Sequence, residues 1–235
     1  MADPFRNIRR KWHLMKGTSS YTHKGVRLRT GPKDIPSAVR GHIFKGTYEA
    51  VEAELVKEVV APGNKVLEVG TGIGFVSILC AKIAGEGNVT SYEANPAMGD
   101  VIRKNYAENG LQSDLRMHAV TVNGSPIQFF ADANVLSSSM IDRNLPTTEI
   151  TVESDAMADV MERVAPDVIV MDVEGAEVDL LSSADLSDVH SMIVEVHPHI
   201  VGAEKIAAME TALAEKGLFP VKVLHKTVLY QRSAP

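Results

Sequence analysis

Short apolar runs and longer amphipathic segments alternate along most of the chain. An apolar run bounded by turn residues is typical of a buried parallel strand, whereas apolar positions about one helical turn apart indicate a helix. The apolar runs predict strands at residues 65–70, 88–93, 167–172 and 191–196. The amphipathic segments predict helices at residues 47–60, 75–84, 96–110, 176–182 and 206–216.

The alternation of strand and helix in both halves predicts an α/β fold with a doubly wound, mostly parallel sheet and right-handed crossovers. Two further strands, at about 218–224 and 226–231, are separated only by a short turn. A short turn cannot form a parallel crossover, so this last pair is predicted to be an antiparallel hairpin. Residues 113–153 also look β-rich, and Thr47 is expected to cap the helix that follows it.

Charge divides the chain unevenly. Residues 1–33 contain nine Lys/Arg and one acid, a net charge of +8, and the remaining residues contain 15 basic and 29 acidic side chains, a net charge of −14. We predict a basic N-terminal arm at residues 1–40, extended and turn-rich from residue 17, and one domain at residues 41–235. The arm is expected to be a solvated tail over the acidic body; contact with phosphate or an anionic surface is the alternative. Its start is Arg-rich like a transit peptide, but its prolines and glycines predict a poor amphipathic helix.

Composition narrows the class of protein. With 45% apolar and 23% charged residues, a chain of 235 residues can bury a core of its own, and it is neither fibrous nor wholly disordered. No apolar run approaches the roughly 18 residues that a membrane span requires, and no signal-peptide core is present, so we expect a cytoplasmic protein. The single cysteine, Cys80, excludes an internal disulfide and is expected to be a packed, inert thiol.

Three glycines follow the first predicted strand. Gly70, Gly72 and Gly74 allow a tight turn and a close approach of a ligand to the main chain. Their G-x-G-x-G spacing differs from the G-x-x-G ending of the dinucleotide fingerprint, and Glu68 precedes them by two residues. A carboxylate there favours a ligand with an ammonium or sulfonium group. At the end of the next strand, Glu93 can bind both hydroxyls of a ribose, so the two strand ends together predict a nucleoside ligand.

At these residues the sequence resembles the class I methyltransferases, which bind S-adenosylmethionine. The resemblance covers about residues 40–200. Within this class, the sequence resembles the FkbM-type methyltransferase family in particular. The motifs that carry it are Gly46-Thr-Tyr48-Glu49, Tyr92-Glu93-Ala-Asn95-Pro96, Met171-Asp172-Val-Glu174-Gly175-Ala-Glu177 and Glu195-Val-His197-Pro198. Family members usually have Asp-Ile-Gly-Ala-Asn-Val-Gly in the first loop, and Thr71 and Gly72 replace the Ala and Asn here, which removes an amide side chain from the pocket.

The resemblance implies S-adenosylmethionine as the cofactor. The residues expected to bind it are Glu68, Gly70, Thr71, Gly72, Gly74, Glu93, Ala94, Asn95 and Asp172. Ser137 to Ser139 and Met140 could border the cofactor or the acceptor, with a polar turn as the alternative.

Asp172, Glu174 and His197 are the candidate catalytic residues, because the strands before them should end at one edge of the sheet. A histidine with a pKa near 6.5 suits removal of a hydroxyl proton, so His197 is the predicted base, oriented by one of the two acids. His199 is the alternative base. Glu174 could instead favour a helix N-terminus, as could Glu177, and Glu195 is either a satisfied buried acid or part of the site. These side chains could also hold a divalent ion, but their spacing is not diagnostic, and we expect no metal.

These features predict an S-adenosylmethionine-dependent O-methyltransferase that acts on a hydroxyl of a small molecule or sugar. One alternative is a nicotinamide-dependent oxidoreductase, which the glycine spacing and Glu68 disfavour. The other is an RNA methyltransferase or RNA-binding protein that uses the basic arm, which the acidic body and the 5% aromatic content disfavour. We therefore expect no nucleic-acid partner, and the sequence leaves the oligomeric state open, a homo-oligomer included.

Overall fold

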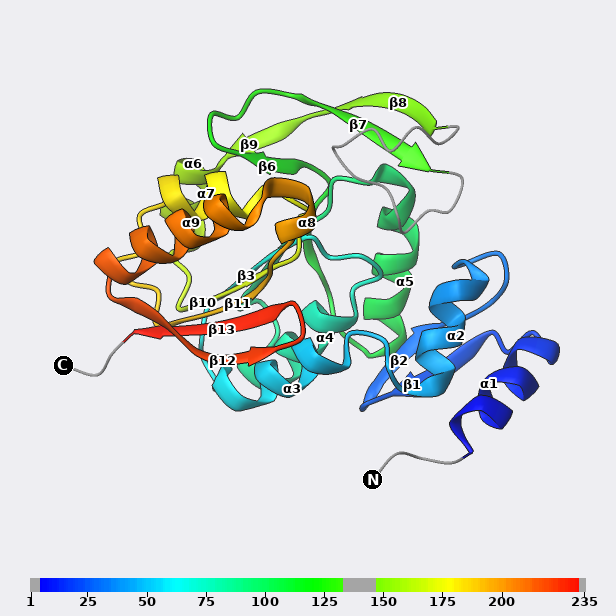
Figure 1. Ribbon diagram of the computed structural model, residues 1–235. Helices are drawn as coiled ribbons and strands as arrows, with labels where there is room; N and C mark the ends of the chain where they lie inside the picture. The colour runs from blue at the N-terminus through cyan, green and yellow to red at the C-terminus, as the bar shows by residue number, and fades with distance from the viewer. Residues whose placement is uncertain (1–4, 133–146, 233–235) are drawn as a thin grey trace.

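A single twisted sheet organises the computed structural model, which describes residues 5–132 and 147–232 (Figure 1). Within these residues the largest sheet has seven strands. Their order across the sheet is β12 (Leu218–Leu224), β13 (Thr227–Arg232), β11 (Ser191–Glu195), β10 (Val168–Met171), β3 (Val66–Val69), β4 (Val89–Tyr92) and β5 (Asp114–Arg116).

The sheet is parallel except at β13, which runs antiparallel to both β11 and β12. The chain moves outward from β3 through β4 to β5 on one side, and β10 and β11 are added on the other side. Strand order therefore reverses between β3 and β10, which is where ligands bind in open α/β sheets. The predicted fold class and the C-terminal antiparallel hairpin are both confirmed.

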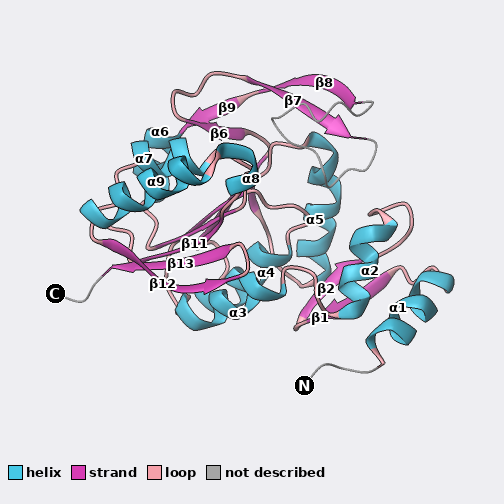
Figure 2. Ribbon diagram, viewed as in Figure 1, coloured by secondary structure: helices cyan, strands magenta, loops and turns pink. Residues whose placement is uncertain are grey.

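Helices cover both faces of this sheet (Figure 2). Alternate strand residues point to opposite faces, so Val168 and Val170 of β10 belong to one core cluster, and Ile169 and Met171 belong to the other. The first cluster contains α3 (Ala50–Val59), α4 (Phe75–Ala84) and α5 (Gly99–Glu108). The second contains α6 (Met157–Val164), α7 (Glu177–Ser183) and α9 (Ala203–Glu215). Burial on both faces explains why these strands read as continuous apolar runs.

Two smaller sheets lie beyond β5 in the sequence. β6 (Ala119–Thr121) pairs in parallel with β9 (Ser154–Ala156), and β7 (Ile127–Asp132) pairs antiparallel with β8 (Thr147–Val152). The prediction that residues 113–153 are rich in β-structure is confirmed where the structure describes them. Met140 and Ser137 to Ser139 lie outside the described residues.

Residues 5–40 differ from the expected solvated tail. They form α1 (Arg6–Met15), β1 (Ser20–His23), β2 (Val26–Arg29) and the start of α2 (Ser37–Lys45). Val26, Leu28 and Ile35 are buried in the same core cluster as Phe44 of α2, and the boundary expected at residue 40 falls inside that helix. The expected poor helix is also wrong, because Gly17 follows α1 and does not interrupt it. No helix in the described part of the chain is long and apolar enough to cross a membrane.

Polar contacts attach this N-terminal segment to the domain. The Arg9 side chain donates hydrogen bonds to the carbonyls of Phe44 (2.7 Å) and Lys45 (3.3 Å), at the carboxyl end of α2, where a cation is favoured. The buried Asn105 of α5 accepts a hydrogen bond from the backbone N–H of Arg29 (2.7 Å) and donates one to the carbonyl of Ile73 (2.7 Å). The β1–β2 hairpin is therefore connected to the glycine loop through one amide side chain.

The start of α3 is a smaller correction. The helix begins at Ala50, and Glu49 is its N-cap residue, with a left-handed φ of 40°. Thr47 does not cap α3, because its hydroxyl lies 3.4 Å from the carbonyl of His42 and 3.1 Å from the ring of that residue, at the end of α2.

Candidate active site

Four neighbouring strands reach one edge of the sheet in register. There Tyr92 of β4, Val69 of β3, Met171 of β10 and Val194 of β11 lie opposite one another. The residues that follow them in the chain are Glu93, Gly70 and Asp172, just beyond their strands, and Glu195, the last residue of β11. The fold thus brings together residues that are up to 125 positions apart in the sequence, and three of the four are acids.

Gly70 makes the tightest contact at this edge. Its φ is +89°, and a Cβ atom placed on it would lie 1.8 Å from the carbonyl oxygen of Asp172. Its N–H donates to the carbonyl of Tyr92 (2.9 Å), and the N–H of Asp172 donates to the carbonyl of Val69 (3.0 Å). Only glycine combines this backbone conformation with this approach. The first turn of the loop is therefore fixed against the ends of both β4 and β10.

The other two glycines of the loop are also in a backbone conformation that favours glycine. Gly72 and Gly74 also have left-handed φ values, +58° and +82°. A Cβ on Gly72 would lie 3.3 Å from the hydroxyl of Tyr48 and 3.6 Å from a carboxylate oxygen of Glu49. These two side chains reach the loop from the turn before α3. Tyr48 and Glu49 were not predicted to belong to the site. In the sequence, they stand out only as part of the Gly46-Thr-Tyr48-Glu49 motif, which contributes to the family resemblance.

Glu93 is bound directly to the loop. Its carboxylate accepts hydrogen bonds from the N–H groups of Gly72 (2.8 Å) and Asn95 (2.7 Å), and the residue is 8% exposed. Burial raises the pKa of Glu93 to about 7, although the surrounding backbone N–H groups act in the opposite direction. The Asn95 side chain accepts from the N–H of Ala97 (3.1 Å), so it caps the short helix η1 (Pro96–Met98). Ala94, between them, packs partly buried against a small apolar cluster at β6 and β8.

Glu68 and Thr71 lie beneath the loop. Glu68 is 1% exposed, and burial raises its pKa to about 7, with the hydroxyls of Thr71, Ser91 and Ser77 lowering it in part. Its Oε2 atom has no hydrogen-bond partner within the described residues. The Thr71 hydroxyl donates to the carbonyl of Tyr92 (3.1 Å), so this side chain also points inward. The two residues support the loop from inside the protein.

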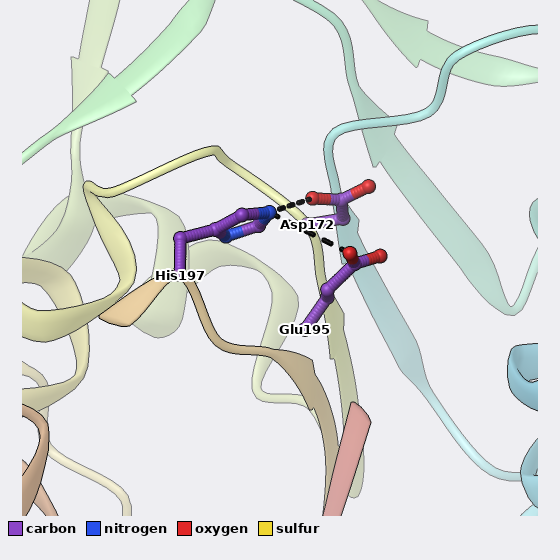
Figure 3. A group of neighbouring side chains, drawn as sticks. All are labelled: Asp172, Glu195 and His197. Atoms are coloured by element: carbon purple, nitrogen blue, oxygen red, sulfur yellow. Dashed lines mark ion pairs between the residues drawn. The ribbon is translucent and has the colours of Figure 1, made fainter. Parts of the chain in front are cut away.

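Three titratable side chains meet at the ends of β10 and β11 (Figure 3). His197 Nε2 lies 3.7 Å from Asp172 Oδ1 and 3.6 Å from Glu195 Oε1. The imidazole is 6% exposed, whereas the Asp172 and Glu195 side chains are 49% and 26% exposed. One edge of a nearly buried ring therefore faces two carboxylates that solvent or an acceptor can reach.

Glu177 fixes the other edge of that ring. It is fully buried at the start of α7, and its Oε1 accepts from the backbone N–H of His197 (2.9 Å) and lies 3.4 Å from Nδ1. Its Oε2 accepts from the N–H of Gly175 (2.6 Å). Burial alone would raise the pKa of Glu177, but these hydrogen bonds outweigh it and lower the pKa. Glu177 is thus an ionised support for His197, a role that the helix-terminus interpretation did not include.

The surroundings of His197 are acidic. Burial lowers the pKa of its imidazole, but Glu177, Asp172 and Glu195 outweigh this effect, and the pKa lies above its ordinary value. Burial and the charge of Glu195 raise the pKa of Asp172. Burial likewise raises the pKa of Glu195, which Lys226 approaches at 3.8 Å. The pKa values of all three groups are therefore raised, which favours the protonated form of each.

The remaining candidates lie outside this cluster. Glu174 lies in the turn after β10 and has a left-handed φ of 45°. The acid that lies beside His197 together with Asp172 is Glu195, where Glu174 was expected. His199 is exposed on α8 (Pro198–Val201), with its ring centroid 5.8 Å from that of His197. Cys80 is buried in α4, where burial raises the pKa of its thiol.

This edge fits S-adenosylmethionine. The two oxygens of the Glu93 carboxylate accept from the N–H groups of Gly72 and Asn95 and have lone pairs left for two ribose hydroxyls. Burial raises the pKa values of Glu49 and Asp172, and a bound ammonium or sulfonium group would favour their ionised forms. A doubly wound sheet with this strand order and this loop defines the class of nucleoside-binding methyltransferases.

Comparison with known proteins identifies the family. Residues 68–218 match the model of the methyltransferase FkbM domain, and the chain belongs to this family. The matched domain is an S-adenosylmethionine-dependent methyltransferase domain, so the nicotinamide-dependent oxidoreductase considered above is set aside.

Curated relatives match over shorter stretches. A ribosomal protein L11 methyltransferase of Symbiobacterium thermophilum is 30% identical over 87 residues, which cover 37% of this chain and 28% of that protein. A protein-lysine N-methyltransferase of Chaetomium thermophilum is 34% identical over 67 residues, 28% of this chain and 18% of that protein. The matched stretches are thus less than a third of the length of either relative.

Solved structures are similar over most of the chain. A magnesium protoporphyrin IX methyltransferase of Synechocystis PCC 6803 with bound SAM gives a TM-score of 0.49 at 17% identity, covering 83% of this chain and 84% of that one. A ribosomal protein L11 methylase of Lactobacillus delbrueckii subsp. bulgaricus gives 0.48 at 16% identity, covering 80% of each chain.

The contact between Gly70 and the Asp172 carbonyl can be tested by substitution. Gly70→Ala should lower the free energy of unfolding by at least about 2 kcal/mol, because the new Cβ must displace the Asp172 carbonyl. Gly63→Ala is the matched control: its φ is +87°, but nothing lies within 4 Å of the added atom. Urea unfolding and S-adenosylhomocysteine titration of both variants measure the difference. Equal losses of stability would show that backbone strain alone, and not the contact with β10, requires glycine.

Proposed function

We propose that this methyltransferase transfers the methyl group to a hydroxyl oxygen of a small molecule or sugar. The observation that carries the proposal is the cluster of His197 with Asp172 and Glu195, next to the turn at Gly70 that packs on the Asp172 carbonyl. A hydroxyl must lose its proton as it is methylated, and an imidazole with a pKa near neutrality is the side chain best suited to accept it. The acceptor class itself follows from the family resemblance.

The residues proposed to hold the cofactor fall into two groups. The backbone of Gly70, Thr71, Gly72 and Gly74 would lie against it, and Glu93 would bind the ribose hydroxyls. The flanking positions are Ala94, Asn95 and Asp172, with Glu68 supporting the loop from below. When bound, S-adenosylmethionine supplies an electrophilic methyl group on a sulfonium.

His197 is proposed as the base. Glu177 lies 3.4 Å from Nδ1 on one side of the ring, and Nε2 on the other side faces the carboxylates of Asp172 and Glu195, where an acceptor would bind. Nε2 takes the hydroxyl proton, and the imidazolium that forms is stabilised by Asp172 and Glu195 at 3.6–3.7 Å. Glu174, in the adjoining turn, is proposed to orient the acceptor.

Asp172, Glu195 and His197 also offer one ligand atom each within 4.8 Å of one another, a spacing that a divalent ion could bridge. We propose that none is required. Nε2 must be free to accept the hydroxyl proton, and the imidazolium that then forms supplies positive charge beside the two carboxylates.

A methyl-transfer screen tests the proposed acceptor class. With labelled S-adenosylmethionine, we expect label in hydroxylated sugars or metabolites and none in RNA or in a ribosomal protein fraction. The screen is run with and without EDTA, and equal turnover is the expected result. Label only in RNA or protein would contradict the hydroxyl proposal. Turnover lost with EDTA and restored by Mg²⁺ would assign the three side chains to a metal centre.

Glu93→Ala tests the ribose contact. We expect cofactor affinity to fall by about 1–3 kcal/mol, because a charged acceptor of hydrogen bonds is lost. Calorimetric titration with S-adenosylhomocysteine measures the change. Glu86→Ala is the control, since Glu86 also accepts from a backbone N–H, that of Gln112 (2.6 Å), but lies beyond the far end of α4. Unchanged affinity in Glu93→Ala would place the ribose elsewhere.

His197→Ala tests the base. Turnover should fall by about 10²–10⁴-fold with little change in cofactor affinity, because general-base catalysis is lost and the loop is untouched. His199→Ala should retain turnover. In the native enzyme the low-pH limb of turnover should lie above pH 6.5, since the base must be neutral and its pKa is raised. Glu177→Gln should move that limb to lower pH, because a charge that favours the imidazolium is removed.

The pH profile separates the base from a structural role. If His197 merely packed against α7, Glu177→Gln could lower activity but would leave the limb in place. Undiminished turnover in His197→Ala would transfer the role to His199 or to solvent.

A further inference from the structure

The helix α1 exposes a stripe of large apolar side chains. Phe5, Ile8, Trp12 and Met15 recur at spacings of three and four residues, so they share one face of the helix. They are 66%, 65%, 45% and 82% exposed. Isolated exposed apolar residues are ordinary on a protein surface, but a contiguous row of four marks a contact surface.

The opposite face of α1 attaches the helix to the domain. The His13 ring stacks on Phe44 of α2, with centroids 4.8 Å apart, and meets Tyr21 of β1 edge-on at 5.0 Å. Leu14 packs against the core, and Arg9 donates to carbonyls at the end of α2. The fold therefore holds α1 at the edge of the molecule (Figure 1), and the apolar stripe lies on the exposed side of the helix.

Cations flank the stripe. With 100° between successive residues of a helix, Lys11 falls along one edge of the stripe, and Lys16 along the other. Both are exposed, and Lys16 Nζ lies 4.2 Å from the centre of the Trp12 ring. Arg6 is a third exposed cation on the helix, and α1 itself contains no acid. A surface that binds this face must offer apolar material at its centre and negative charge along both sides.

We propose that α1 docks on the surface of an anionic lipid bilayer. The boundary between headgroups and acyl chains has this layering, and an amphipathic helix with Trp, Phe and Ile on one face and Lys or Arg beside them lies in that plane. The stripe would enter the acyl boundary while the lysine ammonium groups extend to the phosphates. The inference is independent of the proposed acceptor and base, because none of these residues belongs to the active site.

Trp12 is the only tryptophan of the chain, so its fluorescence reports on this face alone. The full-length protein is mixed with vesicles of phosphatidylcholine and phosphatidylglycerol in equal parts, or of phosphatidylcholine alone. We expect co-sedimentation, a blue shift of the emission and protection from iodide quenching with the anionic vesicles only. Binding should weaken as salt is added, because the phosphate contacts are screened.

Matched variants separate the stripe and its cations from the rest of the surface. Lys11→Gln and Lys16→Gln should each weaken vesicle binding about fivefold, whereas Lys33→Gln, an exposed lysine in a turn outside α1, should weaken it less. Ile8→Ser with Met15→Ser should abolish the blue shift. Val122→Ser removes an apolar side chain that is 47% exposed elsewhere and should have no effect. Cofactor affinity, which the variants should all retain, confirms that they are folded.

Three outcomes would overturn the proposal. One is the absence of co-sedimentation and of a blue shift with anionic vesicles. Another is vesicle binding that survives Ile8→Ser with Met15→Ser. The third is a dimer that forms with rising protein concentration, is abolished by the same double substitution and excludes vesicles, which would assign the stripe to a second copy of the chain.

Discussion

The contact between Gly70 and the carbonyl of Asp172 sets the geometry of the whole edge. A Cβ at residue 70 would lie 1.8 Å from that oxygen, so the first turn of the loop can pass over β10 only as glycine. The same turn is bonded to β4 through the carbonyl of Tyr92 (2.9 Å). Three strand ends are thus fixed relative to one another by backbone alone. The side chains of Glu93 and Asp172, which follow β4 and β10 as Gly70 follows β3, are consequently placed on either side of the loop before any ligand binds.

Two buried carboxylates, those of Glu93 and Glu177, bind backbone N–H groups around this edge. Glu93 accepts N–H groups from the loop and from the turn after β4, and Glu177 accepts N–H groups from the turn after β10 and from His197. Each acid therefore joins the ends of two chain segments. Their pKa values are displaced in opposite directions: burial dominates at Glu93 and raises its pKa, whereas hydrogen bonding dominates at Glu177 and lowers it. The lowered pKa favours an ionised Glu177 beside the His197 ring, as the proposed base requires.

What the sequence could predict depended on how local each signal was. The strand positions and the glycine loop follow from apolar runs and turn residues within a few positions, and Glu93 follows from its place at a strand end. Glu195 was left undecided because its role depends on the register of β11 against β10, which no local pattern carries. Tyr48 and Glu49 reach Gly72 through tertiary packing. The helix α1 was missed because the prolines and glycines around it were counted as interruptions, although they lie outside its ends.

The charge distribution of the chain links the active site to the proposed docking of α1. The body beyond residue 33 has a net charge of −14, and part of that charge is gathered around His197, where it complements a sulfonium and favours an imidazolium. The same body is repelled by an anionic bilayer within about 10 Å, the range over which salt leaves charges unscreened. If α1 docks as proposed, attraction at one edge and repulsion over the remainder would orient the molecule. Because the repulsive part is the part that contains the active site, docking through α1 would leave that site open to an acceptor from solution.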